Sequence, residues 1–382
     1  MHAGIGRADP CHDKAVWQIV KGSVRNGKDM GEMTIKDIAK RCGVGVGTVS
    51  RAINNHPDIS QATKEMILDT IKATGFIPNN SARNLKRTDA RCIAIIVKGI
   101  TNFFFADMIR IFEQEIQKNE YAMVLRQVEA YEDEVECALE LIQEKRLRGI
   151  IFLGGAFIHD ELQLQKIKIP FIFSAIGLDE TERGRKMAYS NIALDDREES
   201  CKLIHYLLKQ GYHKIAIITE GTEKPSVGQL RLEGYRRAYA QAGIPVKENL
   251  IFYVDEAIEH YSMKNGYYTM QRILHSDTKF DAVFAISDAI AIGACRAIRE
   301  AGLQIPQDVA VAGYDGIELG EYFMPRLTTI KQPVADMALQ TIQLLLAVIE
   351  GKRKPEHIIF PGELVIKEST GKTYEQPGDQ TL

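Results

Sequence analysis

Side chains that donate or accept hydrogen bonds gather on one side of a short helical pattern near the start of the chain. Residues 46–54 have the periodicity of an amphipathic helix, and Val49, Ala52 and Ile53 fall on its apolar face. Groups that donate or accept hydrogen bonds here would meet phosphate oxygens and the edges of bases. The pattern therefore indicates a helix that contacts nucleic acid. Its outward polar residues are Thr48, Ser50, Arg51 and Asn54.

Two neighbouring helical patterns could position this helix. Thr34 can cap an earlier helix whose third position is Asp37, a weaker form of the capping box. The glycines of residues 43–45 end that helix, and Ser60 can cap a third helix that Gly75 stops. Two short helices joined by so tight a turn are typical of the helix-turn-helix, a DNA-binding motif.

The charge distribution agrees with this interpretation. Residues 33–91 contain ten lysines and arginines and five acidic residues, so the net charge of this segment is about +5. The first 32 residues contribute +1 and the whole chain is −3, so residues 92–382 carry about −9. A basic head on an acidic body favours contact with phosphate at one end only.

Three segments in order carry a family resemblance: TVSRAIN at residues 48–54, FIPN at 76–79 and SARNL at 81–85. The chain resembles the LacI/GalR (lac repressor/galactose repressor) family of bacterial transcription regulators, with these segments matching the recognition helix, the lead into the hinge and the hinge helix. The resemblance implies an α/β fold. A small all-α helix-turn-helix DNA-binding head and a hinge helix would precede a two-lobed, doubly wound, periplasmic-binding-protein-like domain.

The resemblance also implies residue roles at DNA. Arg51 resembles the arginine that reads guanine, although it could instead contact phosphate or solvent. Val46 could touch a thymine methyl group and Gly47 reads nothing, so we expect direct readout to be sparse. The residues expected at DNA are Thr34, Val46, Thr48, Ser50, Arg51 and Asn54 in the head, and Asn79, Ala82, Arg83, Leu85 and Lys86 in the hinge.

The hinge segment has a physical peculiarity. Residues 79–87 are too few for a helix that is stable alone, because isolated helices below about 12–15 residues are marginal in water. We expect the segment to become ordered on DNA. In the family, a leucine resembling Leu85 enters the minor groove and kinks the duplex, and the alternative is an ordinary linker leucine.

From residue 92 onward, short β-rich runs alternate with amphipathic helical stretches, which indicates parallel βαβ units. About 280 residues is long for one sheet, so we expect two doubly wound lobes with ligands bound beyond the carboxyl ends of the strands. The predicted strands are Ile93–Val97, Ala122–Leu125, Gly149–Leu153, Pro170–Phe173, Lys214–Ile218, Ala282–Ala285 and Val309–Ala312.

These patterns predict the following division of the chain. Residues 1–32 form an N-terminal extension that is disordered or precedes the true start. The DNA-binding domain spans 33–78, the hinge helix and linker 79–90, the effector-binding and dimerisation domain 91–370, and a flexible tail 371–382. Within the large domain, lobe 1 takes about 91–193 and 334–361, and lobe 2 about 194–332 and 362–370.

Aromatic and polar residues follow the predicted strands, where the resemblance implies an effector cleft. Aromatic faces would cover a sugar or base, while carboxylates and a guanidinium exchange hydrogen bonds with its polar edge. The alternatives are that the aromatic residues belong to the core and that the Gly-Tyr-Asp-Gly segment is only a turn. The expected effector residues are Phe104, Phe105, Arg231, Tyr261, Ser287, Asp288, Asp315 and Gln332.

Two basic residues bear on the kind of effector. Lys98 and Arg126 end the first two predicted strands, and together with Arg231 they could make the cleft cationic. This leads to the hypothesis of an acidic or phosphorylated sugar. The alternative is that both side chains are ordinary surface charges.

The sequence also argues against other classes of protein. No G-x-S-x-G, H-E-x-x-H or P-loop motif is present, and the nine histidines are dispersed, so we expect no enzyme, cofactor or metal. The six cysteines lack metal-type spacing, no apolar run approaches the ~20 residues that cross a bilayer, and no secretory signal is evident, which favours a cytoplasmic protein.

The resulting prediction is a homodimeric repressor of transcription. It would bind a near-palindromic double-stranded operator, and a small effector, expected to be a carbohydrate, would gate that binding. The alternatives are a sugar receptor of the periplasmic type that does not bind DNA, and a purine-type repressor that needs a corepressor. The sequence does not distinguish an inducer from a corepressor.

Overall fold

The computed structural model describes residues 33–53, 56–74, 76, 91–129, 132–156, 158–177, 188–221 and 226–371. The chain forms two compact units, residues 1–88 and 89–382. None of the helices in the described ranges has the length and apolar character needed to span a bilayer.

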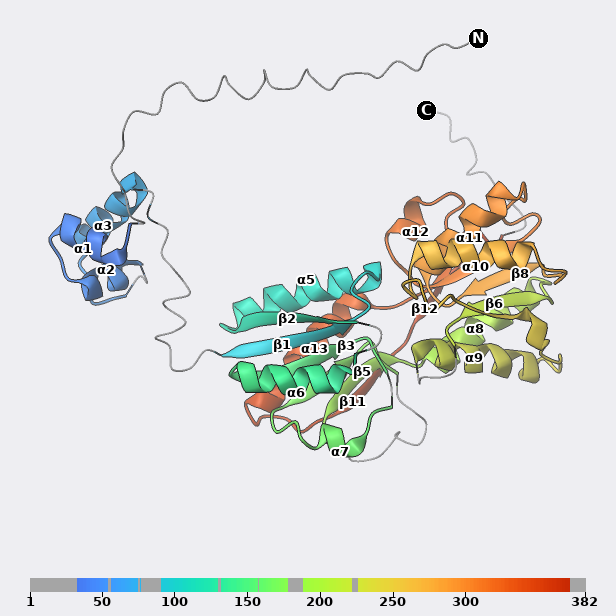
Figure 1. The fold of residues 1–382 in the computed structure, drawn as a ribbon, viewed down its shortest axis with the longest axis horizontal. Helices are drawn as coiled ribbons and strands as arrows, with labels where there is room; N and C mark the ends of the chain where they lie inside the picture. The colour runs from blue at the N-terminus through green and yellow to red at the C-terminus, as the bar shows by residue number, and fades with distance from the viewer. Residues whose placement is uncertain are drawn as a thin grey trace, which may run out of the picture. The chain divides into compact units, whose positions relative to one another are not determined.

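The first unit is built from three helices in its described part: α1 (Ile35–Cys42), α2 (Val46–Ile53) and α3 (Gln61–Thr74) (Figure 1). Thr34 donates from its backbone N–H and its hydroxyl to the carboxylate of Asp37, at 2.9 and 2.6 Å, so the first turn of α1 is capped. Gly43 ends α1 in the left-handed conformation (φ 64°), which glycine adopts without steric cost. The three helices share a small core of Ile38, Ala39, Val49, Ala52 and Ile67.

The second unit contains two six-stranded sheets. The first has the order β11-β5-β4-β3-β1-β2, and all its neighbouring strands are parallel. Helices α5 (Phe103–Lys118) and α6 (Glu134–Glu144) cover opposite faces of it (Figure 1), and α13 (Val334–Ile349) packs beside α5. The strands are β1 (Cys92–Lys98), β2 (Ala122–Val128), β3 (Leu147–Leu153), β4 (Phe171–Ser174), β5 (Ser190–Leu194) and β11 (His357–Phe360), with the short helix α7 (Glu161–Leu164) after β3.

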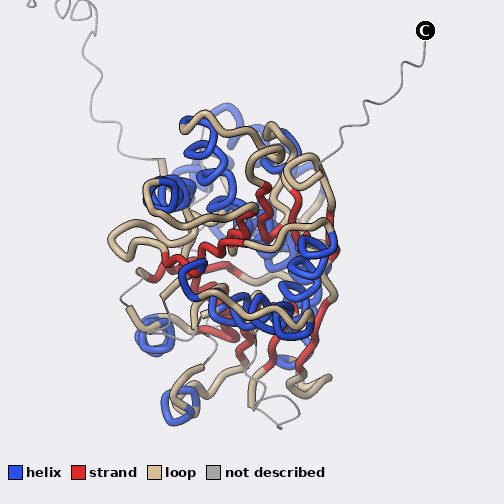
Figure 2. The backbone as a smooth tube through the Cα atoms, turned by 90° about the vertical axis from the view of Figure 1, so that its right-hand side faces the viewer, coloured by secondary structure: helices blue, strands red, loops and turns tan. Residues whose placement is uncertain are grey.

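The second sheet has the order β12-β10-β9-β8-β6-β7 and is parallel except for the pairing of β10 with β12. Its strands lie between helices, as Figure 2 shows for the whole unit. The strands are β6 (Ile215–Thr219), β7 (Ile251–Tyr253), β8 (Ala282–Ala285), β9 (Ala310–Asp315), β10 (Thr328–Lys331) and β12 (Glu363–Val365). The helices are α8 (Asp196–Lys209), α9 (Val227–Gln241), η2 (Glu248–Leu250), α10 (Met263–Leu274), α11 (Asp288–Glu300) and α12 (Leu319–Tyr322).

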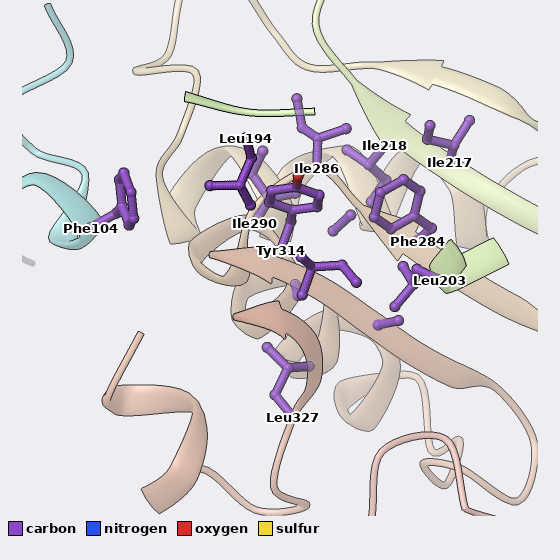
Figure 3. Packing of buried hydrophobic residues seen from close by; sticks show 14 of the residues in the cluster. Phe104, Leu194, Leu203, Ile217, Ile218, Phe284, Ile286, Ile290, Tyr314 and Leu327 are labelled. Carbon is purple, nitrogen blue, oxygen red and sulfur yellow. The ribbon is translucent and has the colours of Figure 1, made fainter. Parts of the chain in front are cut away.

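Both faces of the inner strands β1, β4, β5, β6, β8 and β9 are buried, as the continuous apolar runs predict for parallel strands, whereas the edge strand β2 is partly exposed. Alternate residues of β1 enter different clusters: Ile95 packs in the same cluster as Phe112 of α5, whereas Ile96 shares a cluster with Ala138 of α6. In the second sheet, the ring of Tyr314 lies among the aliphatic side chains of Leu194, Ile286 and Ile290 (Figure 3). The predicted fold class, a helical head followed by two parallel-sheet lobes, is confirmed.

All seven predicted runs fall on strands, with ends that differ by a few residues. Five strands were not predicted: β5, β7, β10, β11 and β12. Each is three to five residues long, and β7, β11 and β12 lie at the edges of the sheets. Such short strands depend on ladder hydrogen bonds to a neighbour more than on a local sequence pattern.

Candidate functional site

Helix α2 presents the polar side chains expected from its sequence. Val49 and Ala52 are buried, whereas Arg51 is exposed and Val46 is 40% exposed. The Arg51 side chain lies back along the helix, where its Nε is 3.4 Å from the carbonyl oxygen of Gly47. The helix therefore keeps an apolar inner face and a polar outer face.

The remaining residues expected at DNA divide into two groups. Thr34 is exposed at the start of α1, and Thr48 and Ser50 are half-buried on α2. Within the described residues, helix α2 extends to Ile53. Six residues of the prediction lie outside the described residues: Asn54, Asn79, Ala82, Arg83, Leu85 and Lys86.

A cavity of about 530 Å³ lies within the second unit, and its walls come from both sheets. The carboxyl ends of parallel strands meet there, as expected for doubly wound sheets. The first sheet contributes Lys98 at the end of β1 and Gly154 after β3, and the second contributes Glu220 after β6 and Asp315 at the end of β9. Of the residues predicted from sequence, Phe104, Phe105, Arg231, Tyr261, Asp315, Gln332 and Lys98 line this cavity.

Arg231 is the centre of a buried polar cluster on the cavity wall. Its Nε donates to Asp196 at 2.9 Å, and its Nη1 lies 3.6 Å from the carboxylate of Asp315. The guanidinium carbon is 3.7 Å from the centre of the Tyr314 ring, a cation–π distance. The amide of Gln332 donates to Asp315 at 2.8 Å. These contacts fix a planar cation and a carboxylate side by side.

Burial raises the pKa values of both carboxyl groups in this cluster. Removal from water raises the pKa of Asp315 to about 7, although the Arg231 guanidinium opposes the shift. Burial likewise raises the pKa of Asp196. Asp315 also has a backbone φ of 117°, which residues other than glycine rarely adopt. The surrounding contacts must therefore hold the Asp315 backbone in this conformation.

A second polar cluster joins the predicted residue Tyr261 to two residues that were not predicted from sequence, Glu220 and His260. Glu220 accepts a hydrogen bond from the Tyr261 hydroxyl at 2.7 Å, and its other oxygen is 3.0 Å from Nδ1 of His260. These hydrogen bonds outweigh burial and lower the pKa of Glu220, while the bond with Glu220 raises the pKa of His260. Because Glu220 directly follows β6, the rule that ligands bind at strand ends could have identified it.

The two phenylalanines occupy the apolar part of the wall. Asn102 caps α5 by accepting a hydrogen bond from the N–H of Phe104 at 3.1 Å. The rings of Phe104 and Phe105 are 5.5 Å apart, and the two residues are only 4% and 8% exposed. They therefore serve the core of the first lobe and the cavity together.

The prediction that Ser287 and Asp288 line the cleft is wrong. Ser287 caps α11 by accepting from the N–H of Ile290 at 3.2 Å, and both residues are fully buried outside the cavity wall. The Asp288 carboxylate accepts hydrogen bonds from the N–H groups of Gly316 and Ile317 at 2.7 and 2.8 Å. It supports the turn that follows Asp315 and is absent from the cavity wall.

The prediction of a cationic cleft is also wrong. Arg126 is exposed, lies 3.5 Å from Glu132 and is absent from the cavity wall. Lys98 does reach the wall, but its ammonium group is 3.0 Å from the carboxylate of Glu134. Among the described lining residues, two permanent cations face five carboxylates, from Glu129, Glu220, Glu256, Glu259 and Asp315.

Comparison with known proteins supports both parts of this arrangement. Residues 34–79 match the model "Bacterial regulatory proteins, lacI family", and residues 204–370 match "Periplasmic binding protein-like domain". The HTH-type transcriptional regulator MalR of Clostridium butyricum is 36% identical over 340 residues, which cover 88% of this chain and 99% of MalR. The chain belongs to the lacI family.

Other similar proteins extend the comparison. The probable HTH-type transcriptional repressor ExuR of Bacillus subtilis (strain 168) is 33% identical, covering 88% of this chain and 98% of ExuR. The transcriptional regulator CelR, solved as a cellobiose complex, has a TM-score of 0.63 at 27% identity and covers 88% of this chain and 99% of its own. The lac repressor dimer bound to operator and the anti-inducer ONPF has a TM-score of 0.69 at 23% identity, covering 89% and 99%, which is a likeness of fold.

As a member of the lacI family, the chain is a DNA-binding transcriptional regulator that responds to a small molecule, and it is not an enzyme. Regulators of this family bind operators and act as dimers. The resemblance inferred from the recognition helix and the hinge is confirmed.

Proposed function

We propose that the chain is a homodimeric repressor that acts in the cytoplasm, where each head binds half of a near-palindromic operator. Helix α2 enters the major groove, with Arg51 reading a base edge and Val46 contacting a methyl group. Thr34, Thr48 and Ser50 position the head on phosphates, and Asn54 extends this set. The exposed polar face of α2 over its buried apolar face supports this assignment.

The hinge segment is assigned the second part of DNA recognition. Asn79, Ala82, Arg83, Leu85 and Lys86 would order on the operator, with Leu85 entering the minor groove at its centre. Because Val46 and Gly47 offer little direct readout, this wedge and Arg51 carry most of the specificity. Steep salt dependence is expected, since each phosphate contact releases counterions.

The proposed effector is a carbohydrate bound in the 530 Å³ cavity. The observation that carries this proposal is the buried group of Arg231, Asp315 and Gln332, since a fixed guanidinium beside a carboxylate exchanges hydrogen bonds with neighbouring hydroxyls. Tyr261 and Glu220 extend the polar wall, and Phe104 and Phe105 provide the apolar surface. CelR, solved with cellobiose, and a LacI-family regulator of Enterococcus faecium, solved with ribose, bind ligands of this class.

Effector and operator are coupled through the two lobes. A ligand that touches both sheets stabilises one relative position of the lobes, and that position changes the ordering of the hinge. Such a coupling is typically worth about 1–3 kcal/mol and acts equally on both affinities. An inducer and a corepressor would use the same architecture, but the coupling free energy between effector and operator would have opposite signs.

A two-step experiment tests this function. A thermal-shift screen of neutral sugars, sugar phosphates, uronates and purines identifies the effector, because a ligand of the folded state raises Tm by mass action. Fluorescence anisotropy with an operator library then measures binding with and without the hit at two salt concentrations. We expect a carbohydrate hit and salt-dependent operator binding that the hit changes.

Two results would contradict the proposal. A carbohydrate hit without binding to any operator would indicate a sugar receptor. Purines as the only ligands, with operator binding that requires them, would indicate a purine-type repressor.

A further inference from the structure

A buried carboxylate lies behind the first-lobe wall of the cavity. Glu134, in the first turn of α6, is 3% exposed, and one oxygen accepts from the Nζ of Lys98 at 3.0 Å. Its other oxygen accepts from the backbone N–H of Ala156, on the cavity wall, at 2.8 Å. The carbonyl oxygen of Glu132 accepts a further bond from the Lys98 ammonium at 2.8 Å. Glu134 thus joins the end of β1 to the loop after β3.

The loop after β3 is shaped to admit this carboxylate. A Cβ atom at Gly155 would come within 2.5 Å of the Glu134 side-chain oxygen, and the backbone there has a φ of 111°. Glycine is the residue that satisfies both conditions. His159 stacks on Phe173, with its Nε2 3.9 Å from Glu134, and burial lowers the pKa of His159. The histidine therefore adds no permanent charge beside the pair.

Two of the three N–H donors of the Lys98 ammonium group have acceptors in the described part of the chain. These acceptors are the oxygens of Glu132 and Glu134. The side chain of Lys98 is 21% exposed and forms part of the cavity wall. A ligand oxygen can therefore meet a donor whose charge is already balanced.

We propose that the Glu134–Lys98 pair selects uncharged carbohydrates and rejects phosphorylated ones. This inference rests on the proposed carbohydrate effector and specifies its class. A hydroxyl group accepts the remaining N–H of Lys98 without disturbing the pair. A phosphate group would bring negative charge close to Glu134 and to the four glutamate carboxylates of the wall, with no unbalanced cation to offset it. The other cation of the wall, Arg231, is paired with Asp196 and Asp315.

The decisive variant is Glu134→Gln. The side-chain carbonyl oxygen of the glutamine can still accept a hydrogen bond from the backbone N–H of Ala156. The substitution removes the negative charge that balances Lys98. Inorganic phosphate and glucose 6-phosphate are the probes, measured by isothermal calorimetry on the full chain. We expect both to bind the variant at least about tenfold more tightly than the wild type, with a gain that falls as salt is raised. Glu136→Gln, the same change at an exposed position of α6, should leave phosphate binding unchanged.

A double variant assigns the effect to the pair. Lys98→Met with Glu134→Gln removes both charges, so no buried charge remains alone. It should lose the phosphate binding gained by Glu134→Gln and bind the neutral sugar from the screen about tenfold more weakly than the wild type. If the single variant Glu134→Gln does not fold, the weaker binding of the neutral sugar by the double variant still tests the role of Lys98.

Three results would overturn the proposal. They are phosphate binding by the wild type as tight as by Glu134→Gln, a gain that persists in the double variant, or a double variant that binds the neutral sugar as the wild type does. The phosphate measurements do not involve DNA. Absent operator binding would therefore refute the proposed function while leaving this inference intact.

Discussion

The hydroxyl group of Tyr261 donates a hydrogen bond to the carboxylate of Glu220 at 2.7 Å. This bond fixes an aromatic ring of the cavity wall against a carboxylate that follows β6, 41 positions earlier in the chain. The second oxygen of Glu220 is held by His260 at 3.0 Å. The cavity wall therefore contains a carboxylate that is hydrogen-bonded to both a tyrosine and a histidine.

Replacing His260 with glutamine should reduce the pH dependence of stability. The hydrogen bond with Glu220 raises the pKa of His260 above its ordinary value of 6.5, so the folded state binds this proton more tightly than the unfolded state. The resulting stabilisation is complete below about pH 6.5 and is lost as pH rises through the raised pKa of the folded form. His260→Gln should therefore lose more stability at about pH 6 than at pH 8.5 in urea unfolding. His275→Gln, an exposed histidine after α10, is the control, and equal losses at both pH values would contradict the prediction.

Replacing Arg51 with alanine should weaken operator binding and relax sequence preference. Loss of a bidentate contact with guanine is worth about 1–3 kcal/mol. Lys72→Ala removes the same charge at an exposed position in the last turn of α3. Anisotropy on matched and single-mismatch operators measures both variants. Equal effects of the two substitutions on every operator would mean that Arg51 contributes charge alone.

Replacing Leu85 with alanine should weaken operator binding at least as much as replacing Thr34, Thr48 or Ser50. The reason is that insertion of an apolar side chain kinks the duplex and allows further contacts, whereas phosphate contacts only fix register. Circular-permutation gel shifts should show a smaller bend for Leu85→Ala. If Leu85→Ala bends the operator fully and binds it with unchanged affinity, the hinge does not take part in operator recognition.

Replacing Asp288 with asparagine should weaken effector binding although Asp288 does not line the cavity. One carboxylate oxygen accepts from the N–H groups of Gly316 and Ile317, and the other accepts from the hydroxyl group of Thr329. Asparagine offers the two amides only an uncharged oxygen, which is a weaker acceptor, and its NH2 group cannot accept from Thr329. We expect a loss of about 2–3 kcal/mol in stability and about tenfold in effector affinity, because the turn after Asp315 loses its support.

Ser287→Ala serves as the comparison for Asp288. It removes only the cap of α11, which typically costs about 1 kcal/mol, and effector affinity should not change. Urea unfolding and calorimetry with the effector found in the screen measure both variants. If they lower effector affinity equally, the role of Asp288 is general stability.

The sequence alone determined the class of the protein, because that information lies in local patterns. The helix periodicity at Val49 and Ala52, the pairing of Thr34 with Asp37 and the apolar runs of the main strands all act within a few residues. Such patterns predict the elements directly, and the order of the elements indicates the family. The family resemblance, together with the rule that parallel strands present ligands at their carboxyl ends, placed Phe104, Arg231 and Asp315 near one another.

Only the tertiary structure decided which side chains face the cavity and what charge they present there. In the sequence, Lys98 indicates an anionic ligand. In the structure its charge is balanced by Glu134, which is 36 positions away in the chain. Asp288 follows a strand end as Glu220 does, yet its carboxylate turns inward to the amides of residues 316 and 317. Burial and pairing depend on groups that are distant in sequence and close in space. A local pattern contains the residue types but not their distances, and the distances decide the chemistry of the site.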